Sequence, residues 1–186
     1  LYVDETSGEA TYKISLKGEY DEYDLSDVFC GVPVGSTVAI NKIVKIDLTY
    51  VNKPINNINF SYSDLRDINF GNNVKSIAEN GFHTCDITEL IIPESITSIE
   101  ERAFRCSYKL TSITIHDKIE YIGDGFLAGC SALTSVNIAD NPKYVWDSEN
   151  RVVIETETNT LISGFANSKI PNTIKIIGKS AFDPNR

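Results

Sequence analysis

A repeat of 22 or 23 residues constrains the fold of this chain more than any other feature of its sequence. Equivalent isoleucines stand at Ile77, Ile99 and Ile122, and the same pattern returns at Ile177 after an insertion. A fixed period of this size is typical of a stacked solenoid, in which every repeat forms one coil. Because one coil has too few apolar side chains to be stable alone, each coil must bury its apolar face against its neighbours. We therefore expect these four isoleucines to line up as one buried row.

Each repeat contains a strand-like run, a break and a returning segment. Alternate residues of the run, such as Ile113 and Ile115, are apolar, which is typical of a strand that buries one face. A residue such as Pro93 ends the strand, because proline cannot donate a hydrogen bond to a neighbouring strand. A large apolar residue follows, on what we expect to be one turn of α- or 3₁₀-helix; these residues are Phe82, Phe104, Leu127 and Phe182.

The repeat resembles the BspA-like leucine-rich repeats of bacterial and protist surface proteins. Their consensus reads roughly Leu-Thr-Ser-Ile-Thr-Ile-Pro-x-Ser-Val-Thr-Ser-Ile-Gly-x-x-Ala-Phe-x-x-Cys, and the resemblance covers residues 65–182. The best matching stretches are Ile92–Ile99 with Ala103-Phe104, and Ile170–Ile174 with Ala181-Phe182. The resemblance implies a right-handed α/β repeat solenoid that is rich in short parallel strands, with short helical or 3₁₀ turns.

We expect two parts and one insertion. Residues 1–42 form an N-terminal cap or a degenerate repeat, and residues 43–186 form the solenoid, which is interrupted at 140–169. Within the insertion, apolar runs at 151–155 and 160–163 are separated by four polar residues, which predicts a β-hairpin. An Asn-Pro-x-Tyr stretch before such a hairpin also resembles the BspA-like family.

Composition excludes some classes of function. The chain has 186 residues and a formal net charge of −9, which argues against a nucleic-acid partner because phosphates attract positive charge. No apolar run approaches the roughly 18 residues of a membrane span, so we expect no transmembrane segment in this chain. Methionine is absent, so we expect either that a leading segment has been removed or that the chain is a piece of a longer protein.

The four cysteines could form a disulfide framework or serve as small buried side chains. Cys85 and Cys130 occupy the same place in the repeat but lie two coils apart, which separates them by about 10 Å. A disulfide needs Cα atoms within about 7 Å. Cys106 lies on the coil between them but one position out of register. We therefore favour free, buried thiols at these three positions and at Cys30.

The sequence contains no recognisable catalytic or metal-binding pattern. His83 and His116 are the only histidines, neither has a nucleophile or acid at a known spacing, and we interpret both as exposed turn residues. Phosphate-binding loops and cysteine–histidine zinc patterns are also absent. We therefore predict that the chain is not an enzyme and holds no cofactor or metal ion.

The outward residues of the stacked strands form the first candidate binding surface. Stacking would turn them into a continuous face of the kind that solenoids use to bind extended partners, although it could also be a merely solvated sheet. The central column consists of Asn69, Ile91, Thr114 and Asn137, and beside it run Arg66, Asp67, Thr88 and Glu89. Ile91 is the unusual member, because it is a large apolar residue at an outward position.

Two aromatic residues of the insertion, Tyr144 and Trp146, form the second candidate surface. If their rings are exposed, they could anchor a protein partner or stack on a sugar. If they are not, they pack the hairpin onto the solenoid.

The resemblance implies a monomeric, non-catalytic adhesion module that binds a host or matrix protein outside the cell or at its surface. The alternatives are a carbohydrate-binding module that uses Tyr144 and Trp146, and a non-catalytic part of a larger secreted enzyme.

Overall fold

The computed structural model describes residues 45–49, 51, 54–138, 140–165 and 167–182, together with the backbone alone at 2–4, 10–13, 23–24 and 43–44. All regular secondary structure in these residues is β-strand, and the strands form a β-solenoid. The predicted solenoid of short parallel strands is confirmed. The division at residue 42 stays a prediction, because most of residues 1–42 lie outside the described part of the chain.

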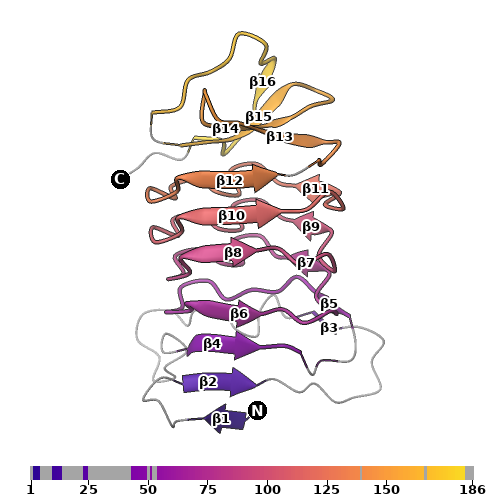
Figure 1. The fold of residues 1–186 in the computed structure, drawn as a ribbon, viewed down its shortest axis with the longest axis vertical. Helices are drawn as coiled ribbons and strands as arrows, with labels where there is room; N and C mark the ends of the chain where they lie inside the picture. Colours follow the sequence, from indigo (N-terminus) through magenta and orange to yellow (C-terminus); the bar gives the residue numbers. More distant parts are fainter. Residues whose placement is uncertain are drawn as a thin grey trace.

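One side of the solenoid is a column of parallel strands (Figure 1). Ile113 in this column lies opposite Leu90 on one side and Val136 on the other, so the strand register follows the sequence repeat. One sheet contains β2 (Ala10–Lys13), β4 (Ile43–Asp47) and β6 (Asp67–Asn69), with β1 (Tyr2–Asp4) antiparallel at its edge, and another contains β8 (Glu89–Ile91), β10 (Ser112–Ile115) and β12 (Ser135–Ile138).

Shorter strands form a second column on the other side of the core (Figure 1). These strands are β7 (Ser76–Ile77), β9 (Ser98–Ile99) and β11 (Tyr121–Ile122), and below them β3 (Tyr23–Asp24) pairs with β5 (Ile55–Asn56). Ile77, Ile99 and Ile122 lie opposite one another in parallel register, and all three are buried. The predicted row of equivalent isoleucines is confirmed for these three coils.

Phenylalanine rings stack along the axis of the solenoid between the two columns. The ring centroids of Phe60 and Phe82 lie 5.8 Å apart, and those of Phe82 and Phe104 lie 5.4 Å apart with nearly parallel planes. All three side chains are buried. Three consecutive coils therefore each supply one ring to a continuous aromatic core, in the repeat position where the sequence places a large apolar side chain.

The returning segments are not helical, so the prediction of short helical or 3₁₀ turns is wrong for the described residues. Successive backbone N–H groups of these segments donate alternately to a carbonyl of their own coil and to a carbonyl of the next coil. Gly81 N–H donates to the Ala78 carbonyl of its own coil, whereas Phe82 N–H donates to the Ala103 carbonyl of the next coil. Left-handed residues recur at two positions, namely Asn80, Arg102 and Gly125 at the first and Tyr62, Thr84, Cys106 and Gly129 at the second.

The spacing of the coils explains why a helix does not form here. An α-helix with its side chains is roughly 10 Å wide and uses its amides internally. Adjacent strands lie only about 4.8 Å apart, so helices on consecutive coils would force the coils to splay. The alternating arrangement is narrower than a helix, and every second N–H group in it donates a hydrogen bond to the neighbouring coil.

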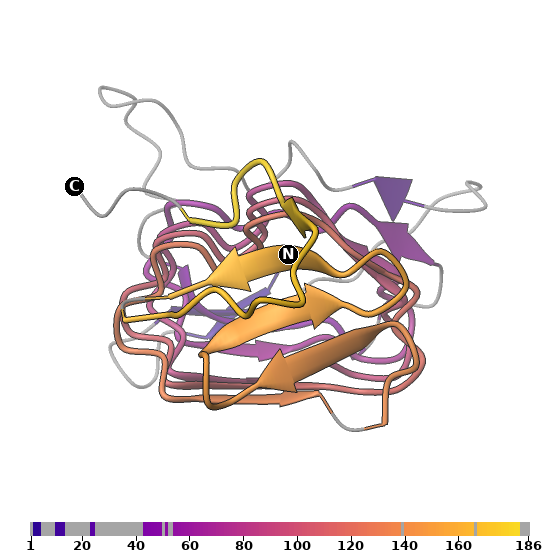
Figure 2. The ribbon, with the colours of Figure 1, turned by 90° about the horizontal axis from the view of Figure 1, so that it is seen from above.

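A second kind of sheet lies across the end of the stack (Figure 2). It contains β13 (Tyr144–Asp147), β14 (Val152–Glu155), β15 (Thr160–Gly164) and β16 (Ile176–Ile177), in that order. β14 and β15 are antiparallel, and residues 156–159 form the turn between them. The predicted hairpin insertion is confirmed, and β13 extends it to three antiparallel strands.

Asn141 anchors this sheet to the coil beneath it. Its side-chain Nδ2–H group lies within hydrogen-bond distance of the carbonyls of His116, Asp117 and Ile119, at 3.0 to 3.3 Å. Its Oδ1 accepts a hydrogen bond from Tyr144 N–H. The asparagine of the Asn-Pro-x-Tyr stretch therefore holds the chain at the point where it leaves the regular coils.

Ile177 does not continue the buried isoleucine row, so this part of the prediction is wrong. It pairs with Leu161 of β15, not with Ile122, and its side chain is 50% exposed. The inserted hairpin sheet separates the last repeat from the third isoleucine of the row. Ile177 keeps its position in the repeat pattern, but no described coil covers it.

Candidate functional site

The strand face brings together the residues predicted for the first surface. Thr114 of β10 lies opposite Ile91 of β8 and Asn137 of β12. Asn69 lies on β6, opposite Asp47 of β4. Ile91, Asn69 and Asn137 are exposed and Thr114 is half-buried, which agrees with the predicted outward column.

The column is interrupted between β6 and β8, which belong to different sheets and do not pair. A groove of about 320 Å³ lies at this break; we call it the strand-face groove. Its lining residues are Arg66, Asp67, Ile68, Ile87, Glu89, Leu90 and Ile91. Four predicted surface residues therefore meet there. Nothing in the sequence signals the break, because the repeat spacing across it is unchanged.

Ile91 dominates the apolar part of the strand-face groove, since its side chain is 74% exposed. Charged residues surround it. Arg66 Nε lies 4.0 Å from Asp86 Oδ2, which also accepts a hydrogen bond of 2.6 Å from Lys109. These exposed ion pairs add little stability, but they place charges of both signs near the groove.

The threonine column beside the strands has a structural role that sequence analysis missed. Thr111 Oγ1–H donates to the Thr88 carbonyl at 2.8 Å, and Thr134 Oγ1–H donates to the Thr111 carbonyl at 3.2 Å. The threonine of each Leu-Thr-Ser stretch therefore links its coil to the previous one. Thr88 lies on the predicted surface, and its backbone is part of this link.

The aromatic pair of the insertion does not form an exposed platform. Tyr144 is buried, and its hydroxyl oxygen accepts a hydrogen bond of 2.9 Å from Ile122 N–H. Burial raises the pKa of this hydroxyl. Trp146 is half-buried, with its ring 5.4 Å from that of Phe165. Of the two alternatives for this pair, packing of the hairpin onto the solenoid therefore applies to Tyr144, because its hydroxyl reaches an amide of the coil below.

Replacing Tyr144 with phenylalanine should destabilise the fold by about 1–3 kcal/mol, because the buried amide of Ile122 loses this acceptor. Urea denaturation would measure the change. Tyr121→Phe is the matched control, because the Tyr121 side chain is exposed and water replaces its lost partner. Equal stability of the two variants would contradict the proposed role of the Tyr144 hydroxyl.

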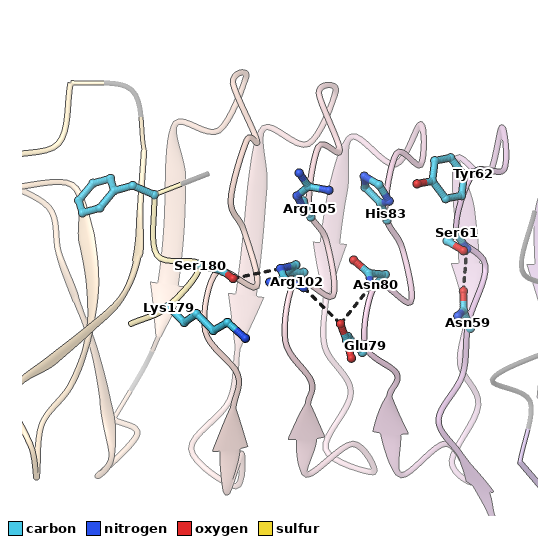
Figure 3. Close-up of a pocket in the computed structure, with 11 residues that line it drawn as sticks. Asn59, Ser61, Tyr62, Glu79, Asn80, His83, Arg102, Arg105, Lys179 and Ser180 are labelled. Carbon is cyan, nitrogen blue, oxygen red and sulfur yellow. Dashed lines mark hydrogen bonds and ion pairs between the residues drawn. The ribbon is translucent and has the colours of Figure 1, made fainter. Parts of the chain in front are cut away.

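A second, larger groove is built from the returning segments and the last coil (Figure 3); we call it the return groove. Its volume is about 610 Å³. Its lining residues are Asn59, Ser61, Tyr62, Glu79, Asn80, His83, Arg102, Arg105, Lys179, Ser180 and Phe182. None of them could be recognised as a binding residue from the sequence, because they come from four repeats and no single repeat carries the cluster.

Several contacts fix the side chains of the return groove. Arg102 Nε–H donates to Ser180 Oγ at 3.0 Å, and Arg102 Nη1 lies 3.4 Å from Glu79 Oε1. The His83 and Tyr62 rings meet edge to face at 4.6 Å. His83 is buried, so its interpretation as an exposed turn residue is wrong: the Tyr62 ring of the previous coil packs against it.

The thiols and hydroxyls that close each return segment form a ladder in the core. The donors at this position are Cys85, Ser107 and Cys130, and each bonds to a carbonyl of the previous coil, from Phe60, Phe82 and Phe104 respectively. Cys85, Cys106 and Cys130 are free, as predicted, and Cys85 and Cys130 are buried. Cys106 is half-buried, and Cys30 lies outside the described residues.

Burial raises the pKa of Cys85 and of Cys130 to about 12, so neither thiol is ionised at neutral pH and neither can act as a nucleophile. In a Cys30→Ser background, we expect Ellman's reagent to modify Cys106 first at pH 8. Cys85 and Cys130 should react only after addition of urea. Reaction of all three thiols at one rate in the native protein would contradict their burial.

The raised pKa values of these two thiols also make the stability of the fold depend on pH. The thiols have an ordinary value of 9.0, which burial raises. Their contribution to stability is therefore complete below about pH 9 and is lost as the pH rises towards 12.

Within the described ranges, no group of three or more histidine, cysteine, aspartate or glutamate side chains could hold a metal ion. The described part of the chain also contains no helix with the length and apolarity to cross a membrane.

The sequence of the chain was compared with protein-family models and with curated proteins. The family model for the BspA type leucine rich repeat region matches residues 39–149 in six copies. No curated protein matches the chain.

Three solved structures are similar to this chain to different degrees. A leucine-rich repeat protein from Eubacterium ventriosum ATCC 27560 matches 91% of this chain and 44% of its own, with a TM-score of 0.68 and 18% identity. A leucine-rich repeat protein from Bacteroides ovatus ATCC 8483 matches 75% and 46%, with a TM-score of 0.46 and 19% identity. A leucine rich cell surface protein from Faecalibacterium prausnitzii A2-165 matches 95% and 64%, with a TM-score of 0.43 and 19% identity. The chain therefore spans less than two thirds of each protein, and the first likeness supports the fold alone.

Proposed function

Because the chain belongs to the BspA-type leucine-rich repeat family, we propose that it is a non-catalytic module that binds a protein partner outside the cell or at its surface. The strand face is the proposed binding surface, and the strand-face groove is its centre. The observation that carries this proposal is Ile91, a large apolar side chain that stands 74% exposed at the break between two sheets.

An extended segment of a partner fits the chemistry of this groove. Ile91 offers an apolar contact of the kind that anchors interfaces, while Arg66, Asp67 and Glu89 provide charges of both signs at the margin. Among the described strands, β6 pairs only with β4 and β8 pairs only with β10. Each therefore has a strand edge at the break, and a partner in strand conformation can add hydrogen bonds to such an edge.

Binding to immobilised host or matrix proteins, measured by biolayer interferometry, tests this proposal. Ile91→Asp and Thr114→Arg should each weaken binding about tenfold or more, because they place a charge at the centre of the surface. Asn69→Arg should act in the same direction from the neighbouring strand. Ile170→Asp is the matched control, since Ile170 is also exposed but belongs to the last repeat. Unchanged affinity for all three strand-face variants would exclude this face.

The other functional interpretations have different support. The carbohydrate platform of Tyr144 and Trp146 is not proposed, because Tyr144 is buried. That the chain is a non-catalytic part of a larger secreted enzyme stays a prediction, and so does its monomeric state.

A further inference from the structure

We propose that the return groove is a second binding site, which takes an acidic saccharide: a sugar ring that carries a carboxylate or a sulfate. This site is separate from the strand face, so it does not depend on the protein-binding proposal. It rests on four properties of the groove, which are its charge, its polar lining, its exposed ring and its paired backbone.

The charge of the return groove is opposite to that of the whole chain. Among the lining residues that the structure describes, Arg102, Arg105 and Lys179 stand against one carboxylate, that of Glu79, although the chain carries a net charge of −9. The contacts with Glu79 and Ser180 hold the Arg102 guanidinium in one orientation. A guanidinium presents several donors in a planar fork, which suits carboxylate and sulfate groups.

The uncharged part of the lining suits a sugar ring. Asn59, Ser61 and Asn80 supply amide and hydroxyl groups, which can pair with sugar hydroxyls. Tyr62 is 56% exposed and is held by its edge contact with His83, so its ring offers a fixed apolar surface on which a sugar can stack. The volume of about 610 Å³ lies within the roughly 300–1,000 Å³ that is usual for small-molecule sites.

The backbone around the groove favours a saccharide over an acidic peptide. A peptide that adds to a sheet needs main-chain donors and acceptors that have no partner. Here Tyr62 N–H donates to the His83 carbonyl at 2.7 Å, His83 N–H donates to Asn80, and Asn80 N–H donates to Glu101. Recognition must therefore use side chains, which is how the hydroxyls and the acidic group of a sugar would be bound.

Isothermal titration calorimetry with the 186-residue chain tests this site. The acidic probes are trigalacturonate, which carries carboxylates and no sulfate, and neocarrabiose 4-sulfate, which carries a sulfate and no carboxylate, so the difference between them identifies the preferred acid. Maltotriose is the neutral probe, and hexaglutamate is the peptide probe. We expect binding of at least one acidic saccharide, weakened by added salt, and no binding of maltotriose or hexaglutamate.

Two variants and two matched controls locate the site. Lys179→Gln removes one charge and should weaken binding of the acidic saccharide about tenfold. Tyr62→Asn removes the ring, and asparagine tolerates the left-handed backbone at this position (φ 59°); it should weaken binding about fivefold. Lys118→Gln and Tyr108→Asn make the same changes at exposed residues outside the lining and should have no effect.

Three results would overturn the proposal. The first is the absence of binding of both acidic saccharides at millimolar concentration. The second is equal weakening by the control variants. The third is tighter binding of hexaglutamate than of either saccharide, which would assign the groove to an acidic peptide. None of these results bears on the strand face, whose variants are tested with protein partners.

Discussion

Replacement of Phe82 by alanine is expected to destabilise the protein by about 3–5 kcal/mol, the largest effect of a single truncation that we anticipate. The Phe82 side chain is completely buried. Its ring contacts three others, at centroid distances of 5.8 Å to Phe60, 5.9 Å to Phe70 and 5.4 Å to Phe104. Truncation leaves a cavity and removes aromatic contacts on both neighbouring coils, and such contacts are worth about 0.5–1.5 kcal/mol each.

Phe182→Ala is the matched control for this prediction. Phe182 occupies the same position in the last repeat, but its side chain is 41% exposed. Its loss should cost about 1 kcal/mol or less. Urea denaturation followed by circular dichroism would measure both variants. If Phe82→Ala cost no more than Phe182→Ala, the aromatic stack would not be the core that joins the coils.

Replacement of Gly125 by alanine is expected to displace the last coil and to cost about 2 kcal/mol or more. A Cβ atom at Gly125 would lie 2.2 Å from the carbonyl oxygen of Ser180, a separation that the backbone cannot accept without moving. Gly125 also has a left-handed φ of 65°. Side chains are tolerated at this φ in equivalent positions of other coils, at Asn80 and Arg102, so the contact with Ser180 is the decisive difference.

Gly129→Ala is the control that separates backbone strain from the clash. Gly129 has a φ of 76°, but its nearest neighbour would be the Cys106 sulfur atom at 3.1 Å. This variant should cost about 1–2 kcal/mol, chiefly through left-handed strain, because its closest contact is with a side-chain atom and not with the backbone. Hydrogen exchange would report where the structure opens. Gly178 N–H donates to the Leu161 carbonyl and Ala181 N–H donates to the Gly178 carbonyl, and Gly125→Ala should speed the exchange of both amides. Equal exchange in both variants would contradict displacement of the last coil.

The solenoid, its register and its insertion could be predicted from the sequence because they depend on patterns that repeat locally. Alternating apolar residues define strands, and a constant period brings Ile77, Ile99 and Ile122 into one row whatever the other details of the fold. The hairpin at 152–164 follows from two apolar runs and a short polar turn. The family followed from the same repeated residues.

The conformation of the returning segments could not be predicted in the same way. A helical turn and the observed alternating turn both place Phe82 and Phe104 towards the core. The distance between coils decides between the helical turn and the alternating turn. Only the alternating turn is narrow enough to leave amide groups that bond to the next coil. The burial of Tyr144 and His83 also depends on neighbours, the Ile122 amide and the Tyr62 ring, that lie about one repeat away in the sequence.

The sequence by itself therefore determined the repeat, the strand column and the row of isoleucines, because these require only a periodic pattern and burial of apolar side chains. Tertiary structure alone decided the two grooves. One opens where β6 and β8 fail to pair, although the repeat spacing there is regular. The other depends on contacts such as that of Arg102 with Ser180, 78 residues apart in the sequence. Such contacts arise only when the last coil has folded back over the hairpin, and no periodic pattern encodes them.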